Sequence, residues 1–264
     1  MISEESFFAG IKKATSIDFL KFRASYGSLG NQASVSEYGY IPTMSFTPQI
    51  GQILGSSLPS AVNVPGAVSP SYTWEKVNTT NFGVDMLLLD KRLELNFDKY
   101  SRVVNGMLVP GKTLPAVFGT GVPMVNAGDM QTKGFELKLS WHDKVKVGGS
   151  DFYYNFTASL ADSKALITRF DNPTLSLNNY YKGQELGEIW GLGVDGFFKS
   201  QDEINAKDYS AVGEDDNNYT FYVGDLKFTD RNKDGKVNFG KYTVNDPGDL
   251  YKIGNASPHL PYSF

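Results

Sequence analysis

Apolar and polar residues alternate with a period of two over long stretches of the chain. In residues 92–105, Leu93, Leu95 and Phe97 alternate with charged and polar residues. The same alternation recurs in residues 18–27, 74–89, 132–142 and 151–162. A period of two is the side-chain period of a β-strand. The pattern therefore predicts an all-β, antiparallel chain whose sheet has one apolar and one polar face.

The lengths of these strands and of their connections narrow the fold class. Each candidate strand runs for ten residues or more, against the usual five or six in soluble sheets. Short connections at 90–91 and 143–150 alternate with long ones at 106–129 and after residue 163. Both features are typical of a transmembrane β-barrel. A soluble antiparallel sandwich is also apolar on one face and stays open as the alternative.

The remaining segments are less regular. Residues 3–14 are predicted to form one short helix, because Ser3 can cap it and acidic residues occupy its first turn. Residues 28–73 are rich in Gly, Ser, Pro and Asn, which predicts a loop with one strand near 38–54. Near predicted strand ends, where a barrel has its aromatic girdle, stand Trp74, Tyr100 and Trp141.

Composition excludes several classes of protein. The chain has 264 residues with 25 Lys and Arg against 29 Asp and Glu, a formal net charge of −4. This balance offers no basic surface for nucleic acid. With no Cys and two His, a disulfide scaffold, a thiol nucleophile and a Cys-ligated zinc are excluded. No run of about 18 apolar residues predicts a membrane-spanning helix.

Catalytic motifs find little support. Residues 106–113 match the phosphate-loop pattern G-x-x-x-x-G-K-[ST], but Pro115 follows where a helix would have to begin. Neither His142 nor His259 has a Ser or Asp at a spacing that indicates a triad. We therefore expect that the protein is not an enzyme. An NTPase or a glycosidase would be the catalytic alternative.

A second motif points to calcium. The side chains of Asp230, Asn232 and Asp234 stand at positions 1, 3 and 5 of a loop with Gly235 at position 6. This is the first half of a calcium loop, in which the backbone carbonyl of Lys236 would add a further oxygen.

The calcium motif is incomplete. Lys241 stands where an EF-hand has its bidentate Glu. Asp246 or Asp249 would have to supply the missing carboxylate. A metal-free turn rich in Asp and Asn that joins two strands is the alternative, and the residues alone do not decide between the two.

Five segments of the chain carry a family resemblance. They are residues 3–7 (SEESF) followed by 19–31 (FLKFRASYGSLGN), 74–85 (WEKVNTTNFGVD), 126–136 (NAGDMQTKGFE), 224–235 (GDLKFTDRNKDG) and 246–258 (DPGD leading to IGNASP). In order and spacing these segments resemble the SusC/RagA-type TonB-dependent outer-membrane transporters. Together they extend over nearly the whole chain. The resemblance also points to Asp249 as the carboxylate that closes the calcium-like turn.

The resemblance implies a fold and a context. Residues 1–264 would be a partial barrel domain, one piece of a 22-stranded barrel. The plug, the N-terminal extension and the remaining strands would be absent, and residues 1–5 do not begin a signal peptide. The parent protein would lie in the bacterial outer membrane, in contact with its lipid. It would import oligosaccharides or peptides, with a SusD-like surface lipoprotein as lid and TonB as the energy source through the absent part.

Loops at 28–73, 106–129 and 199–222 are where lid or substrate contact is expected. The rival hypothesis is a soluble, calcium-stabilised β-sandwich module that binds glycans through loop aromatics. Neither hypothesis includes an organic cofactor.

Overall fold

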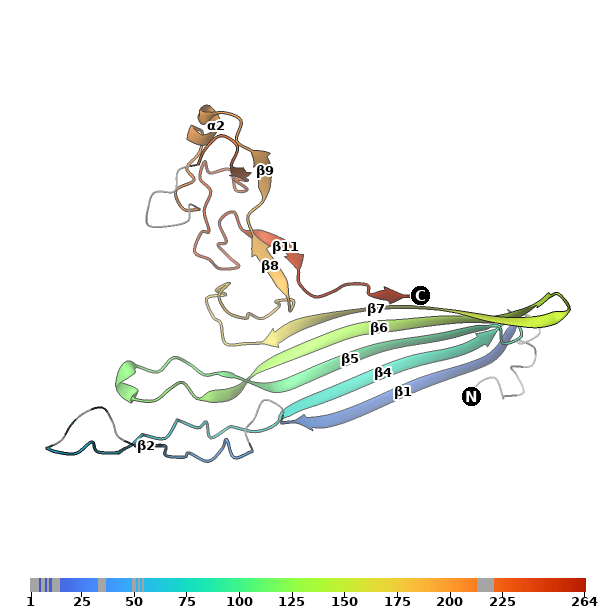
Figure 1. Cartoon of the computed structure of the whole chain (residues 1–264), viewed down its shortest axis with the longest axis horizontal. Coiled ribbons are helices and arrows are strands. Elements are labelled where there is room, and N and C mark those ends of the chain that lie inside the picture. The colour runs from blue at the N-terminus through green and yellow to red at the C-terminus, as the bar shows by residue number, and fades with distance from the viewer. Residues whose placement is uncertain are drawn as a thin grey trace.

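The computed structural model describes residues 5, 8, 10, 15–32, 37–48, 51, 53, 55–212 and 221–264. Most of the helix predicted over 3–14 lies outside these residues. The main feature is one antiparallel sheet in which each long strand pairs with the next along the chain (Figure 1). In sheet order its strands are β1 (Ile17–Asn31), β4 (Glu75–Leu88), β5 (Leu93–Pro110), β6 (Met124–Val147), β7 (Ser150–Arg169) and β12 (Tyr262–Ser263).

The register of the sheet gives it two chemically different faces. Residues directly opposite one another in neighbouring strands lie on the same face. One such row consists of Phe22, Val84, Phe97, Leu137, Leu160 and Tyr262. The adjacent row, on the other face, consists of Arg23, Gly83, Asp98, Glu136 and Ala161. The predicted alternation is therefore confirmed as an apolar face and a polar face.

The apolar face is not packed against another layer of the described chain. Phe22, Phe82 and Phe156 expose 60%, 61% and 57% of their surface. In a sandwich, a second sheet would cover these side chains. In the described part of the chain, the long strands make extensive contacts with their sheet neighbours and not with a facing sheet. This arrangement is that of an open barrel wall, and it argues against the sandwich alternative.

Two tight turns connect long strands at one end of the sheet (Figure 1). Asp90 and Lys91 have φ of 58° and 63°, and the Arg92 amide donates to the Leu89 carbonyl at 3.2 Å. This confirms the predicted turn at 90–91. The second turn is shorter than the predicted 143–150, because β6 and β7 stay paired up to Val147 and Ser150.

The loops at the other end are long, but they begin and end differently from the prediction. The loop predicted at 106–129 is residues 111–123, with a 3-10 turn η2 (Ala116–Phe118). Gly106, at a φ of 69°, accommodates a bulge where the register shifts, so pairing continues beyond it. The loop predicted at 28–73 begins after Asn31 and contains a pair of two-residue strands, β2 (Phe46–Thr47) and β3 (Ala61–Val62).

Residues 170–261 form an insertion between β7 and β12 that stands beside the end of β7 (Figure 1). It contains the strand pairs β8 (Glu188–Gly191) with β11 (Tyr251–Asn255) and β9 (Val194–Phe197) with β10 (Leu226–Phe228), and the helix α2 (Gln201–Asn205). Its core comprises the buried residues Phe198, Tyr209, Phe221 and Val237. No helix in the described residues combines the length and the apolarity of a membrane span.

Candidate functional site

The polar face is organised around Arg23, whose guanidinium binds two carboxylates. Nε and Nη2 donate to Asp85 at 2.9 Å each. Nη1 and Nη2 donate to Asp98 at 3.0 and 2.8 Å. Asn81 and Asn96 each donate a further hydrogen bond to one of these carboxylates, at 3.0 and 3.2 Å. Planar bidentate pairing of this kind is specific to Arg, and here it links β1, β4 and β5.

Gly83 makes room for the guanidinium. A Cβ built at this position would lie 2.7 Å from the Cζ of Arg23 and 2.7 Å from Oδ1 of Asp98. Gly134 has a similar role further along the face, where its Cβ would lie 2.6 Å from the ring of Tyr100. Tyr100 therefore belongs to the polar face, and its assignment to an aromatic girdle was wrong. The period of two in the sequence already indicates that Tyr100 is on the polar face, because it lies two residues after Asp98 on the same strand.

A hollow of about 650 Å³ adjoins the Arg23 cluster on the polar face. Arg23, Asn96, Asp98, Glu136 and Lys138 contribute its charged and polar lining. Both signs of charge are present, and Arg23 neutralises part of the negative charge through its ion pairs. In a closed barrel this face would line a water-filled interior.

Residues 126–136, one of the segments that carry the family resemblance, include two side chains that hold backbone atoms at the long-loop end of the sheet. The Asn126 side-chain amide donates to the carbonyls of Thr73 at 2.8 Å and of Gly106 at 2.6 Å. Asp129 accepts from the Gly106 amide at 2.8 Å and from Arg169 at 2.6 and 2.8 Å. These contacts fix the bulge at Gly106 and the start of the loop. The sequence alone offered no signal that pairs Arg169 with Asp129.

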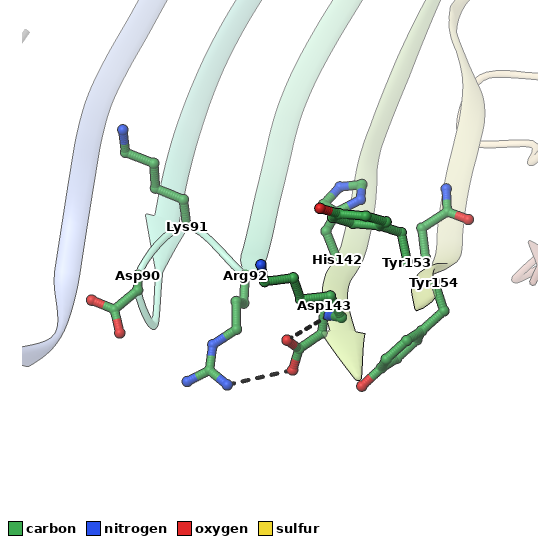
Figure 2. Close-up of a pocket in the computed structure, with 9 residues that line it drawn as sticks. Asp90, Lys91, Arg92, His142, Asp143, Tyr153 and Tyr154 are labelled. Atoms are coloured by element: carbon green, nitrogen blue, oxygen red, sulfur yellow. Dashed lines mark hydrogen bonds and ion pairs between the residues drawn. The ribbon is translucent and has the colours of Figure 1, made fainter. Parts of the chain in front are cut away.

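The short-turn end of the sheet carries a second hollow, of about 550 Å³ (Figure 2). In Figure 2, Lys91 and His142 extend toward the top of the view, and Arg92 and Asp143 extend toward the bottom. Arg92 Nη1 lies 3.4 Å from Asp143, and its guanidinium stacks over Trp141 at 5.7 Å from the ring centroid. Trp141 lies on the apolar face one row beyond Leu139, opposite Leu93 at the start of β5. An aromatic–cation pair therefore stands at the rim of that face.

The insertion brings the five residues of the calcium-like motif to one turn. Asp249, fully buried, accepts backbone hydrogen bonds from Arg231 at 2.7 Å, Asn232 at 3.3 Å and Asn238 at 2.9 Å. Both of its oxygens are therefore used by the turn itself. Asp249 is the sequence-distant carboxylate that the resemblance pointed to, and it organises the loop through amide groups.

Most of the other side-chain oxygens of the turn also have protein donors. Asp234 Oδ1 accepts from the Lys236 amide at 2.8 Å, and Asn232 Oδ1 from the Asp234 amide at 3.0 Å. Asp230 Oδ2 accepts from the Gly235 amide at 3.1 Å, and its Oδ1 is buried with no hydrogen-bond partner in the described structure.

The charge state of Asp230 follows from these contacts. Burial raises the pKa of Asp230, but the Gly235 amide and the Lys207 ammonium, 3.3 Å away, outweigh it and hold the pKa below its usual value. The carboxylate is thus ionised and already has a cationic neighbour. Across the described residues, no three His, Asp or Glu side chains are arranged to hold a metal ion. Calcium at this turn stays a prediction.

The residues considered for catalysis lie apart. Residues 106–110 belong to strand β5, so the phosphate-loop match has no strand–loop–helix context. Lys112 forms an exposed ion pair with Asp171 at 3.6 Å. His142 lies on the polar face near the turns, whereas His259 lies in the insertion, with Nδ1 3.0 Å from Asp162. No arrangement of nucleophile and base joins them.

Long antiparallel strands with one exposed apolar face, one charged face, short turns at one end and long loops at the other define the wall of a transmembrane β-barrel. Comparison with known proteins assigns the family. The family model described as TonB dependent receptor-like, beta-barrel matches residues 12–253. The chain belongs to this family, and the predicted SusC/RagA-type resemblance is confirmed.

Individual relatives agree. The chain is 25% identical over 274 residues to TonB-dependent receptor P26 of Formosa agariphila, covering 100% of the chain and 25% of that protein. It is 24% identical over 220 residues to TonB-dependent receptor SusC of Bacteroides thetaiotaomicron, covering 75% of the chain and 22% of that protein. A third relative, TonB-dependent receptor P3 of Formosa agariphila, is 30% identical over 130 residues, covering 49% and 12%.

Solved structures show the same fold. The RagAB peptide importer in its closed-closed state superposes with a TM-score of 0.60 at 19% identity, covering 95% of this chain and 25% of that one. Its open-open state gives a TM-score of 0.59 at 18% identity, covering 92% and 24%. This chain spans a quarter or less of the length of each of these proteins.

The Arg23 cluster yields a stability prediction. Gly83→Ala introduces a Cβ into the space that the Arg23 guanidinium occupies. The guanidinium must then move, so its charge-assisted hydrogen bonds to Asp85 and Asp98 are lost or lengthened. We expect the free energy of unfolding to fall by about 1–3 kcal/mol. Thermal unfolding of the protein in detergent, followed by circular dichroism, measures the change. The matched control is Gly27→Ala on β1, where a Cβ meets nothing within 4 Å. Equal stability of the two variants would contradict the assigned role of Gly83.

Proposed function

We propose that this chain forms part of the wall of a TonB-dependent importer in the bacterial outer membrane. The sheet carries the proposal, because its apolar face suits lipid and its charged face suits a water-filled interior. Outer-membrane barrels have short turns on the periplasmic side and long loops outside. By this rule the turns at 90–91 and 148–149 are periplasmic, and the loops and the insertion are extracellular.

The proposed cargo is an oligosaccharide or a peptide, taken up with a SusD-like surface lipoprotein as lid. The name of one structural neighbour supports the peptide alternative, since RagAB is a peptide importer. The oligosaccharide alternative rests on the family resemblance of the sequence. Energy would come from TonB through parts of the protein outside this chain. The segment itself performs no bond-making chemistry. Its contribution is to line the interior and to present the connection after Asn31, the loop at 111–123 and the insertion to the lid or the cargo.

Uptake is the direct test of this function. Disrupting the gene in the bacterium that encodes it should abolish growth on one substrate class, oligosaccharide or peptide, as sole source, because that cargo would exceed general porin passage. Loss of TonB should give the same defect. Growth unchanged on both classes after disruption would contradict the importer proposal.

The lid contact is tested by loop shortening in the complemented strain. Replacing residues 112–122 with a Gly-Ser-Gly linker should weaken co-purification of a surface lipoprotein, measured by quantitative mass spectrometry. A Gly-Ser-Gly insertion between Gly148 and Gly149, at the opposite end of the sheet, is the control and should leave it unchanged. Equal recovery from both variants would place the lid contact elsewhere.

Calcium binding is a separate prediction. The unpartnered Oδ1 of Asp230 supports a site, while the amide donors around Asp249 satisfy the turn without metal. If a site forms, Tb³⁺ luminescence should saturate and be displaced by Ca²⁺, and Asp234→Asn should weaken binding by roughly tenfold because it removes a carboxylate ligand. Asp202→Asn in α2 is the control. Saturable binding that Asp234→Asn leaves unchanged, or no binding, would refute the assignment.

A further inference from the structure

The apolar face of the sheet ends abruptly at the side of the long loops. Counted from the short-turn end toward the long loops, three successive register rows of this face are apolar in every long strand. They run from the row of Leu93 and Trp141 to the row of Phe97 and Leu137. The next row contains Phe82, Lys99, Phe135 and Asp162, and the row beyond it contains Thr80, Ser101, Lys133 and Lys164. Three lysines on three neighbouring strands thus mark the upper boundary of this face.

Lys99 sits between aromatic neighbours. It lies directly opposite Phe82 on β4 and Phe135 on β6, in the last row that still contains large apolar side chains. A lysine in such a position packs its methylene stem along the apolar surface and extends its ammonium toward the polar side.

Lys133 and Lys164 face each other directly across β6 and β7. Like charges directly opposite in an antiparallel pair are destabilising. Among the described residues, neither Lys99 nor Lys133 has a carboxylate within the 4.0 Å of an ion pair. Lys164 lies 3.7 Å from Glu185, but that carboxylate is closer, at 2.8 Å, to Lys252. In the described part of the chain, Lys99 and Lys133 therefore carry positive charge that no carboxylate pairs with, and Lys164 shares its partner.

The acidic group within the boundary rows is engaged elsewhere. Asp162 Oδ1 lies 3.0 Å from His259 Nδ1 and accepts from the Leu260 amide at 3.4 Å. A hollow of about 560 Å³ opens at the same place, and its lining includes the three lysines, Asp162 and the apolar residues Phe82, Phe135 and Leu166. Its apolar floor and cationic edge are complementary to an amphiphile whose head group carries negative charge.

We propose that Lys99, Lys133 and Lys164 bind the phosphate groups of a lipid A-type glycolipid in the outer leaflet, with its acyl chains along Phe82 and Phe135. The inference rests on the proposed function, which places the long loops outside the cell and this edge at the outer leaflet. A phosphate dianion can bridge two opposed ammonium groups and turn their repulsion into a shared contact.

A second copy of the chain is a poorer occupant of this surface. A two-fold interface brings the same patch of both copies together, so lysines would oppose lysines. The alternative of a neutral lipid leaves the ammonium groups of Lys99 and Lys133 without a negative partner. Charge complementarity therefore favours the anionic glycolipid.

The first test needs no variant. The protein in detergent micelles is mixed with phosphorylated lipid A or with the same lipid after its phosphates are removed, and bound lipid is counted by native mass spectrometry. We expect at least about tenfold weaker binding of the dephosphorylated lipid, since an ammonium near an anionic head group contributes on the order of fivefold in affinity. Equal binding of both lipids would overturn the proposal.

The second test locates the site. Lys99→Gln, Lys133→Gln and Lys164→Gln are combined in one protein, and Lys21→Gln, Lys138→Gln and Lys146→Gln on the polar face are combined in a control with the same change of net charge. The first triple variant should lose the preference for phosphorylated lipid A, and the control should keep it. Loss in both would mean unspecific attraction and would overturn the site. Circular dichroism verifies the fold of both proteins.

These results are independent of the uptake experiment. If disruption of the gene leaves growth unchanged but phosphate-selective binding depends on the three lysines, the importer function fails and the lipid site stands. If uptake is lost on disruption but lipid binding ignores the phosphates, the lipid site fails and the importer function stands.

Discussion

Backbone pairing between long antiparallel strands is the constraint on which the rest of this structure depends. A bilayer offers no water to unpaired amide and carbonyl groups, so strands that cross it must satisfy one another. Once they are paired, a period of two assigns each side chain to one of two environments, and a slip of one residue would exchange them. Phe97 and Asp98 lie on opposite faces of β5, and the residues paired with them on β4 and β6 keep the same two faces.

Side chains on the polar face reinforce that register. The guanidinium of Arg23 reaches Asp85 and Asp98 together, and this geometry forms only when β1, β4 and β5 hold their present alignment. Gly83 has no side chain, and the guanidinium occupies the space that a Cβ would take there. At the long-loop end, the side chains of Asn126 and Asp129 bond to backbone atoms of Gly106 and fix the bulge of β5. Polar side chains thus hold neighbouring strands in register as well as carrying charge.

Much of this arrangement could be predicted from the sequence, and the failures have physical causes. Alternation gave the strands and their faces, and the tight turn at 90–91 follows from the strands around it. The ends of the loop at 111–123 were missed because Gly106 indicates a loop, whereas its left-handed conformation instead allows a bulge within a continuing strand. The Arg23 cluster was missed because its partners are 62 and 75 residues away in sequence. The residues of the calcium-like motif do lie at one turn. Their spacing alone could not show that backbone amides donate hydrogen bonds to both oxygens of Asp249.

The central claim is that the two faces of the sheet meet two different solvents, lipid and water. The chain contains no Cys, so single spin labels can be introduced one at a time along residues 93–98 of β5 in the protein reconstituted into a bilayer. Accessibility to oxygen, which is enriched in lipid, and to a water-soluble nickel complex should alternate with a period of two. Labels at Leu93, Leu95 and Phe97 should favour oxygen, and labels at Glu94, Asn96 and Asp98 should favour nickel. Equal accessibility to nickel at all six positions would contradict the account, because it would place both faces of the sheet in water.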